Sequence, residues 1–495
     1  MLIKENKMKI AFVASECYPL VKTGGLADVV SSLSQTLAEL GHEVVVILPY
    51  YKEINSKDIE ITTFFESMCV HMGCGIEEWC SVKTAVLDKK VRVFFIESNK
   101  YFLRDGLYCD QFNNDFQDNP YRFAFFSRAA LQLLRDTDFR PDAVHAHDWQ
   151  TASVCAYMKT WDWGESGIDR AASVLTIHNI GYQGIYSADC LDYCGFDWKF
   201  FTSSIFEDYG RVNFLKGGIH FADFVTTVSP KYAEETLNGT QGYGLAPYLR
   251  EKKDQYIGIL NGVDYSVWDP KGDKMIPENF SARSFKGKAA CKRELQRRFG
   301  LHEDENIPVI GVVSRFAYQK GLDILAKTVG RIVDSMIVQF AVMGSGESEL
   351  ENFFRRISAE RAGKIGCFIG YSDEISHLVE AGSDFFIMPS RYEPCGLNQI
   401  YSLKYGTLPI VRNTGGLADT VQQYCESDGS GTGFKFDYLS PDAIFDTVGW
   451  AVSTYFDRPK HFSVMRKAAM KCDFSWKNSA KQYEKVYKTI LSRFS

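Results

Sequence analysis

Two basic residues stand at the end of an apolar run in the second half of the chain. In the stretch SRFAYQKGLD, Arg315 closes the run and Lys320 precedes a helical pattern. Two cations beside a helix N-terminus are unfavourable by themselves, because that end of a helix already carries partial positive charge. A bound diphosphate would offset this repulsion, since a guanidinium can donate two hydrogen bonds to its oxygens and an ammonium adds a point charge. We therefore predict an anion site here, with two unpartnered surface side chains as the alternative.

The hexapeptide TGGLAD occurs twice, at residues 23–28 and 414–419. Each copy is predicted to follow a strand and to open a helix. Glycine there lets the backbone approach a ligand closely, and the helix N-terminus offers free N–H groups. Lys22 adds a positive charge to the first copy. Neither copy is a Gly-x-Gly-x-x-Gly or a Walker motif. We expect two loops that contact an anion or a sugar, with plain tight turns as the alternative.

Further polar residues follow other apolar runs. The segment PSRYEPCGLNQ places Glu393 before a predicted loop-to-helix entry, where the backbone amides of residues 396–398 would point at phosphate or sugar oxygens. A surface acid beside a helix is the alternative for Glu393. In TIHN, His178 and Asn179 end a predicted strand. Because other polar residues follow the neighbouring strands, we predict that His178 contacts a sugar hydroxyl. A histidine buried in the core is the alternative.

Metal binding is the alternative chemistry for two short motifs. In HAHDW, His145 and His147 share one face of a strand and precede Asp148, but no third ligand is spaced for an ion. Asp136 and Asp138 form an Asp-x-Asp pair that could chelate a divalent ion. This pair stands at the wrong end of the following strand, and we interpret it as a solvated turn. We therefore predict neither a metal nor a cofactor, and protein cations must neutralise any diphosphate.

The elements that position these residues follow from the hydrophobic pattern. Short runs rich in Val, Ile and Phe alternate with longer helical patterns, such as residues 122–136 and 321–336. Continuous apolar runs suit strands that are covered on both faces, and the alternation predicts parallel sheets built from βαβ units. Ligands of such sheets bind beyond the carboxyl ends of the strands. The residues described above are expected at those ends.

The domain organisation follows from the length and from one interruption of the pattern. A chain of 495 residues is expected to form two or three domains. The alternation stops over residues 261–306, which are polar and rich in turn formers. We predict doubly wound α/β Rossmann-like domains at 1–260 and 261–475, and a C-terminal helix at 476–495 that returns to the first domain. Two such domains that face each other would share a ligand in the cleft between them.

The composition excludes several classes of protein. The formal net charge of −6 comes without a basic stripe or a polybasic segment, so we expect neither nucleic-acid nor membrane binding. No apolar run approaches the ~20 residues of a membrane span. Thirteen irregularly spaced cysteines indicate free thiols in a reducing compartment. The N-terminal segment lacks a signal-peptide pattern, and we expect a cytoplasmic protein.

Seven motifs together carry a family resemblance. They are KTGGLADV, HAHDW, TIHN, LNGVD, SRFAYQKGLD, PSRYEPCGLNQ and RNTGGLADTV, in this order along almost the whole chain. With them, the sequence strongly resembles bacterial glycogen synthase and plant starch synthase, of glycosyltransferase family 5. The resemblance implies a GT-B fold and transfer of glucose from ADP-glucose to the non-reducing end of an α-1,4-glucan, either glycogen or a maltooligosaccharide. It also implies retention of the anomeric configuration without a metal.

The resemblance assigns roles to individual positions. The family's catalytic positions fall on Lys22, His178, Arg315, Lys320 and Glu393. Its substrate-binding positions fall on Gly24, Gly25, Asp28, Tyr101, Asp148, Asn179, Asn261, Tyr371, Cys395, Gly396, Leu397 and Asn398. Tyr371 is expected to pack on the nucleotide base. Asn398 departs from the Thr that close relatives often carry, and a backbone contact at this position would survive the change.

Alternatives remain open for both the mechanism and the function. Retention without an evident nucleophile favours attack by the acceptor hydroxyl on the same face as the departing diphosphate. Glu393 as a covalent nucleophile is the second option. Another GT-B transferase that uses a nucleotide sugar is the nearest rival function. A catalytically silent glucan-binding protein is the rival from a different class, although it would be expected to lose Lys22, Arg315, Lys320 or Glu393.

Overall fold

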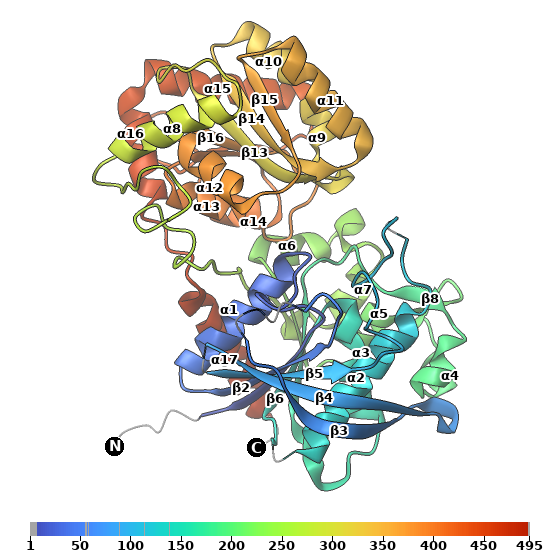
Figure 1. Ribbon diagram of the computed structural model, residues 1–495. Coiled ribbons are helices and arrows are strands. Elements are labelled where there is room, and N and C mark those ends of the chain that lie inside the picture. Colours follow the sequence, from blue (N-terminus) through green and yellow to red (C-terminus); the bar gives the residue numbers. More distant parts are fainter. Residues whose placement is uncertain are drawn as a thin grey trace. The chain divides into compact units, whose positions relative to one another are not determined.

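The computed structural model describes residues 7–54, 57, 59–88, 90–112, 114–137 and 139–493 (Figure 1). The chain forms two compact units. The first comprises residues 1–228, 233–262 and 476–495, and the second comprises residues 229–232 and 263–475. The main boundaries between the units lie after residue 262 and after residue 475. The predicted domain boundaries lie after residues 260 and 475. The grouping of residues 229–232 with the second unit has no signal in the sequence.

A nine-stranded sheet forms the centre of the first unit. Its strand order is β12-β11-β7-β6-β1-β2-β5-β4-β3. The parallel strands are β1 Lys9–Val13, β2 Glu43–Pro49, β5 Val91–Glu97, β6 Ala143–His147, β7 Ala172–Ile177, β11 Phe224–Thr227 and β12 Tyr256–Gly258. Counted in chain order, these strands run 3-2-1-4-5-6 with one strand added, which is the order of a dinucleotide-binding fold. β1 and β6 are neighbours at the point where this order reverses.

An antiparallel hairpin extends this sheet at one edge. β3 Thr62–His71 pairs with β4 Glu77–Leu87, and β4 pairs antiparallel with β5. The sequence analysis predicted only parallel strands and missed both members of the hairpin. The outward face of β3 is mostly exposed and polar, so its pattern lacks the continuous apolar run of a buried strand. A small separate sheet adds β8 Ile185–Ser187, β9 Glu207–Asp208 and β10 Arg211–Asn213.

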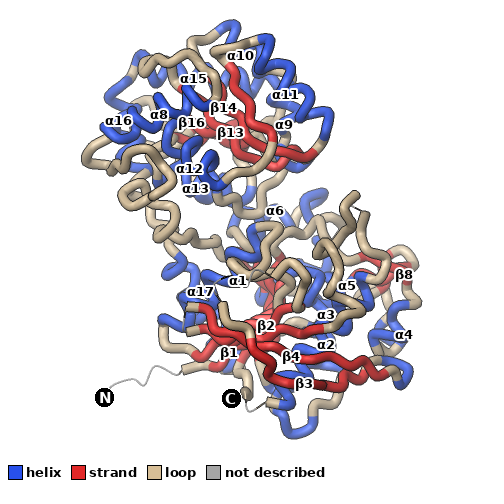
Figure 2. The backbone as a smooth tube through the Cα atoms, in the orientation of Figure 1, coloured by secondary structure: helices blue, strands red, loops and turns tan. Residues whose placement is uncertain are grey.

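Helices cover both faces of the first sheet (Figure 2). The α-helices in this part of the chain are α1 Gly25–Glu39, α2 Asn119–Asp136, α3 Asp148–Thr160, α4 Cys190–Cys194, α5 Phe214–Phe221, α6 Pro230–Thr236, whose first residues group with the second unit, α7 Ala246–Glu251 and α17 Trp476–Leu491. The C-terminal helix α17 packs beside α1 and against β7, and buries Tyr483 and Tyr487 in the core that these elements share. The predicted terminal helix thus belongs to the first unit.

The second unit contains a six-stranded parallel sheet. The order β15-β14-β13-β16-β17-β18 is again 3-2-1-4-5-6 in chain sequence. The strands are β13 Val309–Phe316, β14 Gln339–Gly346, β15 Ile365–Ile369, β16 Phe385–Met388, β17 Leu408–Arg412 and β18 Phe434–Phe436. Separate apolar cores lie on its two faces. The order reverses between β13 and β16, which are neighbours.

The helices of the second unit differ from the predictions at two places. They are α8 Lys286–Arg298, α9 Leu322–Ala326, α10 Val329–Ser335, α11 Ser348–Glu360, α12 Asp373–Gly382, α13 Asn398–Lys404, α14 Gly415–Thr420, α15 Pro441–Asp457 and α16 Pro459–Ala469. The helical pattern at 321–336 is broken into α9 and α10 by Thr328, whose φ of −130° is not helical. The polar segment at 261–306, where the predicted alternation stops, contains α8, whose many charged residues concealed its buried stripe.

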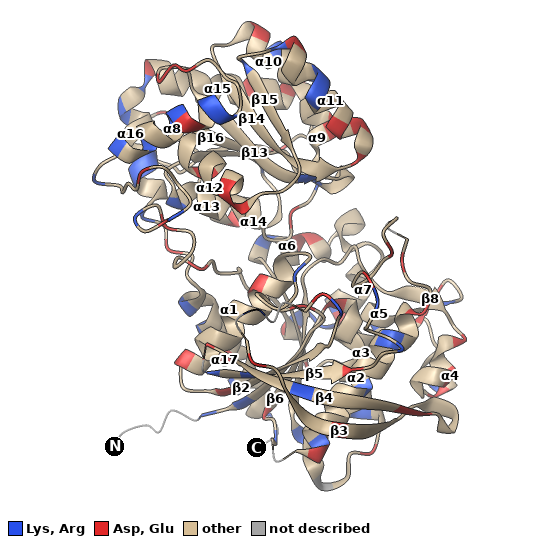
Figure 3. Cartoon of the chain, viewed as in Figure 1, with Lys and Arg blue, Asp and Glu red and all other residues tan. Residues whose placement is uncertain are grey.

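Charge is distributed over both units without a segregated field. Segments with Lys and Arg and segments with Asp and Glu are both scattered over each of the two units (Figure 3), and the formal net charge is −6. Among the helices that the structure describes, none has the length and apolar composition required to cross a lipid bilayer. All thirteen cysteines are free thiols.

Candidate active site

Several of the predicted site residues lie on strands or loops next to the point where the strand order of each sheet reverses. In the first unit, the loop after β1 carries Lys22, and β6 runs directly into Asp148. In the second unit, β13 ends next to Arg315 and Lys320, and the loop after β16 carries Glu393. Open α/β sheets bind ligands beyond the strand ends at such points. Each unit therefore presents its candidate chemistry where its own topology leaves room for a ligand.

A buried carboxylate that the sequence analysis missed holds the first TGG loop. Glu16 is only 3% exposed and accepts hydrogen bonds from the backbone N–H and the hydroxyl of Thr23. It also accepts from the Gly24 N–H at 3.2 Å and from the Tyr108 hydroxyl at 2.6 Å. Its position directly after β1, in the segment SEC, was the available signal. Glu16 satisfies the N–H groups of the loop, and so fixes the loop that presents Lys22.

The positive charge of this loop is held by its own helix. The Lys22 ammonium lies 2.8 Å from an Asp28 carboxylate oxygen, in the first turn of α1. Burial raises the pKa of Asp28 above its ordinary value, and the neighbouring Lys22 opposes this shift. Lys22 remains 44% exposed, so its ammonium can exchange one anionic partner for another. A Cβ added at Gly24 or Gly25 would meet no atom within 4 Å, which leaves the space above this glycine pair open.

Three uncharged histidines, which we call the histidine column, contact one another in series where β6 and β7 end. The rings of His145 and His147 stack with centroids 4.3 Å apart, and His147 Nδ1 lies 3.0 Å from His178 Nε2. His145 hydrogen bonds with the Tyr487 hydroxyl at 2.8 Å and with Thr176 Oγ1 at 2.6 Å. Burial lowers the pKa of His145 and of His178 to about 3. His178 therefore presents an uncharged imidazole, suited to hydrogen bonding with a sugar hydroxyl.

Asp148 turns the chain between β6 and α3 and ties down the neighbouring loop. Its φ of +57° lies in the left-handed region, which is unusual for a residue with a side chain. Its Oδ1 accepts the backbone N–H of His178 at 2.7 Å and that of Asn179 at 3.4 Å. Burial raises the pKa of Asp148 to about 7, although these two N–H groups oppose the shift. Asp148 thereby fixes the orientation of the His178–Asn179 segment.

In the second unit, a buried ion pair joins two of the predicted catalytic residues. The Lys320 ammonium lies 2.7 Å and 3.0 Å from the two carboxylate oxygens of Glu393. The Ser390 hydroxyl donates to the same carboxylate at 3.0 Å. The Glu393 side chain is 5% exposed and that of Lys320 is 19% exposed. The pair is enclosed, and it holds each side chain in one orientation.

The two predicted phosphate-binding cations are therefore not equivalent. Arg315 is exposed, and its guanidinium forms no hydrogen bond or ion pair with any residue that the structure describes. Lys320 ends the single 3-10 turn Tyr318–Lys320, and α9 begins only at Leu322. The argument from two cations at a helix N-terminus was thus wrong for Lys320, because Glu393 already neutralises it. Arg315 is the cation that lacks an internal partner.

The second TGG loop supports the Glu393 segment. The Gly416 N–H donates to the Glu393 carbonyl at 3.0 Å. A Cβ at Gly415, where φ is +45°, would lie 1.9 Å from that carbonyl oxygen, and one at Gly416 would lie 2.0 Å from the Cys395 carbonyl. These glycines are required because two loops of the same unit touch. This copy therefore has a supporting role within its own unit, and its direct contact with a ligand stays a prediction.

The residues after Glu393 are ordered by their own contacts. Cys395 is buried, and Gly396 has φ +70° at the turn that enters α13. Leu397 precedes the helix, and the side-chain amide of Asn398 donates to the Val313 carbonyl of β13 at 3.1 Å. Asn398, which stands where close relatives often carry Thr, therefore links α13 to β13, the strand that carries Arg315.

Three predicted binding residues lie in quite different surroundings. Tyr101 is 2% exposed, and its hydroxyl hydrogen bonds with Glu78 at 2.9 Å and Tyr193 at 2.8 Å. Asn261 is 6% exposed, and its Oδ1 has no hydrogen-bond partner in the described part of the chain. Tyr371 is 68% exposed and donates to Asp373 at 2.5 Å. Tyr371 is accessible to a ligand, whereas the packing around Tyr101 suits a supporting position.

The motifs weighed as metal ligands have other partners. His145 and His147 are engaged in the column described above, and Asp148 accepts backbone N–H groups. Asp136 accepts from the Gln132 amide at 2.7 Å, and Asp138 lies outside the described residues. These contacts explain the histidine motif without an ion.

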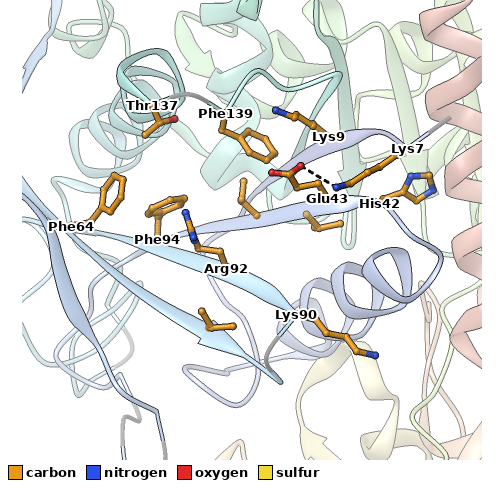
Figure 4. Close-up of a pocket in the computed structure, with 13 residues that line it drawn as sticks. Lys7, Lys9, His42, Glu43, Phe64, Lys90, Arg92, Phe94, Thr137 and Phe139 are labelled. Carbon is orange, nitrogen blue, oxygen red and sulfur yellow. Dashed lines mark ion pairs between the residues drawn. The ribbon is translucent and has the colours of Figure 1, made fainter.

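A hollow of about 720 Å³ in the first unit lies apart from all of these residues (Figure 4). It is lined at the amino ends of β1 and β2 by Lys9 and Glu43, with Phe94, Phe139 and Arg92 nearby. The carboxyl ends of the same strands carry the site described above. This hollow is therefore not a part of the candidate active site.

Comparison with known proteins assigns both units. The family described as "Starch synthase catalytic domain" matches residues 9–251, and the family described as "Glycosyl transferases group 1" matches residues 293–468. The chain is 45% identical to a glycogen synthase of Treponema denticola, over 98% of this chain and 99% of that protein. It is 43% identical to glycogen synthase 1 of Geobacter metallireducens, over 99% and 97% of the two chains.

A solved structure extends the similarity to three dimensions. The catalytic domain of starch synthase IV from Arabidopsis thaliana, bound to ADP and acarbose, superposes with a TM-score of 0.89. Its sequence identity to this chain is 32%, and the alignment covers 98% of this chain and all of the other. The two Rossmann-like sheets are thus those of a GT-B glycosyltransferase.

Proposed function

Because the chain belongs to the glycogen synthase family, a family of glucosyltransferases of glycogen synthesis, we propose that ADP-glucose is its donor. The acceptor is the non-reducing end of glycogen or of a maltooligosaccharide, and the new bond is an α-1,4 linkage with retained configuration. The choice of ADP is supported by the family resemblance and by the ADP bound to the similar starch synthase IV. A nucleotide sugar as donor and a glucan as acceptor are common to the family.

One observation carries the proposal: the enclosed Lys320–Glu393 ion pair follows the end of β13, where Arg315 is exposed and has no partner for its guanidinium among the described residues. When the bond between glucose and diphosphate breaks, negative charge grows on the phosphate oxygens and positive charge grows on the anomeric carbon. Fixed charges that hold those oxygens more strongly as the bond breaks lower the barrier. Arg315 takes the diphosphate, and Lys320 adds positive charge next to the carboxylate of Glu393. No metal is needed for this neutralisation.

The pairing also bears on the choice between the two mechanisms. A carboxylate that is held by an ammonium and by the Ser390 hydroxyl is stabilised in its ground state. Such a group is a weakened nucleophile but still an effective source of negative charge near a developing cation. We therefore favour attack by the acceptor hydroxyl on the face from which the diphosphate leaves. The departing phosphate oxygen accepts the proton of that hydroxyl.

The remaining site residues bind and orient the substrate in this proposal. Neutral His178 hydrogen bonds to a hydroxyl of the glucose, and Asn179 lies beside it on the segment that Asp148 fixes. Lys22 approaches an anionic group of the donor from the open glycine loop. Asn261 contributes its unpaired Oδ1 to the sugar, and exposed Tyr371 packs on the base. The thirteen free thiols are consistent with the proposed cytoplasmic location.

The proposal is tested by incorporation of labelled glucose into glycogen from ADP-glucose and, in parallel, from UDP-glucose. We expect ADP-glucose to be preferred in kcat/KM, and the new bonds to be released by an enzyme specific for α-1,4 linkages. Arg315→Ala should lower kcat by about 100-fold, as loss of a charge-stabilising donor does. Arg331→Ala, on the surface of α10, is the matched control. Preference for UDP-glucose, or a normal kcat in Arg315→Ala, would contradict the proposal.

A further inference from the structure

Outside the active site, three side chains of metal-ligating type converge on the edge hairpin of the first unit. Cys69 and His71 belong to β3, and Glu77 begins β4. One donor atom from each lies within 4.8 Å of the other two. His71 Nδ1 and the Glu77 carboxylate are already 3.7 Å apart. From this convergence we propose that Cys69, His71 and Glu77 bind a single Zn²⁺ ion.

The register of the hairpin accounts for the convergence. Cys69 and His71 are two residues apart on one strand, so their side chains leave the same face of the sheet. Glu77 is the direct cross-strand partner of His71, and opposed side chains on one face of an antiparallel pair lie close together. The grouping is therefore a property of the backbone pairing, and it does not depend on a chance approach of distant loops.

The turn that joins the two strands is anchored, which holds the donors in place. The turn spans Gly73–Gly75 between β3 and β4. A Cβ at Gly73 would lie 1.8 Å from the carbonyl oxygen of Asp192 in α4, so the turn packs directly on that helix. An anchored hairpin loses little conformational freedom when an ion binds, which favours binding over a flexible loop with the same residues.

The donor set selects the metal. Thiolate, imidazole and carboxylate are the protein ligands of Zn²⁺, whereas Mg²⁺ and Ca²⁺ prefer oxygen ligands alone. At Zn–ligand distances of ~2.0–2.3 Å, tetrahedral donors are roughly 3.5 Å apart. Small rotations bring the three together, because His71 and Glu77 have side chains that are 60% and 51% exposed. Water completes the fourth position of the exposed site.

The charges of the site change in a defined way on binding. Binding releases the thiol proton to water and forms the Zn–S bond, so that a thiolate, a carboxylate and a neutral imidazole offset the dication. The resulting complex is electrically neutral.

The test uses the full-length protein, freed of metal by a chelator and titrated with Co²⁺. Cobalt has the same tetrahedral ligand preference, and its bond to a thiolate gives a charge-transfer band in the near ultraviolet. We expect one Co²⁺ per chain, this band, and its loss when Zn²⁺ is added. Cys69→Ser should abolish the band, and His71→Ala should weaken Co²⁺ binding on the order of 100-fold, because loss of outer-shell partners already weakens it 10–100-fold.

Cys74 supplies the matched control, because it is an exposed thiol in the same turn but lies outside the cluster. Cys74→Ser should keep the band and the affinity of the parent. A second readout is alkylation, in which Zn²⁺ should protect Cys69 and leave Cys74 reactive. Glu77→Gln replaces Cys69→Ser if the latter does not fold. Absence of a saturable band, or a band that survives Cys69→Ser or disappears in Cys74→Ser, would overturn the proposed site.

Discussion

The two TGG loops have identical sequences but should respond very differently to the same substitution. At Gly415, alanine would carry its methyl group to within 1.9 Å of the Glu393 carbonyl oxygen, at a φ of +45°. The left-handed conformation costs ~1–2 kcal/mol for a residue with a side chain, and overpacking adds ~1–3 kcal/mol. Gly415→Ala should therefore lower the free energy of unfolding by about 3 kcal/mol, taking a value within the summed range.

Gly24 is the matched control within the same chain. Its φ of −152° is open to any residue, and an added Cβ meets no atom within 4 Å. Gly24→Ala should change the stability by less than ~0.5 kcal/mol, as surface substitutions usually do. If a ligand approaches this backbone, however, the methyl group should lower kcat/KM by about tenfold, which corresponds to ~1.4 kcal/mol of transition-state stabilisation.

Thermal unfolding of the full-length variants, followed by calorimetry, separates the two outcomes. For a unit of this size, ~1 kcal/mol shifts the midpoint by ~2–4 °C, so Gly415→Ala should melt about 10 °C below the parent. Gly24→Ala should melt within ~2 °C of the parent while its activity falls. Equal midpoints for the two variants would refute the inference that the second glycine pair serves the contact with the Glu393 loop.

Two further predictions concern the buried charges. Lys320→Ala leaves the Glu393 carboxylate enclosed without its cation, so the free energy of unfolding should fall by ~3–5 kcal/mol and kcat by about 100-fold. In urea unfolding, the double variant Lys320→Ala, Glu393→Gln should regain the stability of the parent but not its activity. Recovery of activity in the double variant would exclude a role of the pair in the chemistry. Asp148 has its pKa raised to about 7, so the folded state holds its proton above pH ~4, and the stability that Asp148 contributes falls as pH rises towards 7. In urea unfolding, the stability of Asp148→Asn relative to the parent should rise between pH ~4 and 7 and stay constant above pH 7. A stability difference that is the same at every pH would contradict this.

The parts of the structure that local pattern determines were predictable from the sequence. Continuous apolar runs indicated the longer parallel strands of both units, because strands covered on both faces must be apolar throughout. They did not indicate the three-residue strands β12 and β18. The positions of Arg315, Glu393 and His178 at strand ends followed from those runs. The edge hairpin β3–β4 was missed because its strands are half exposed, and the break between α9 and α10 was missed because Thr328 is compatible with either state.

Interactions between residues far apart in the chain were not predictable from one sequence. Lys320 and Glu393 are separated by 73 residues, and Glu16 and Tyr108 by 92. No local period reports such a contact, since the order of the strands in the sheet brings the partners together. The same limit applies to the pairing of His145 with Tyr487, which are 342 residues apart. The sequence indicated which residues have suitable chemistry but not which of them neutralise one another.

The repeated hexapeptide shows why this distinction matters for function. Both copies begin a helix, as their shared residues direct, with α1 starting at Gly25 and α14 at Gly415. Their surroundings differ. Glu16 accepts a hydrogen bond from the first loop, whose glycines have free space where a side chain would begin. The glycines of the second loop pack against the segment from Glu393 to Cys395. The same local structure therefore exposes its backbone in one unit and supports a charged residue in the other. An identical motif is evidence of identical local geometry, and its role has to be argued from what touches it.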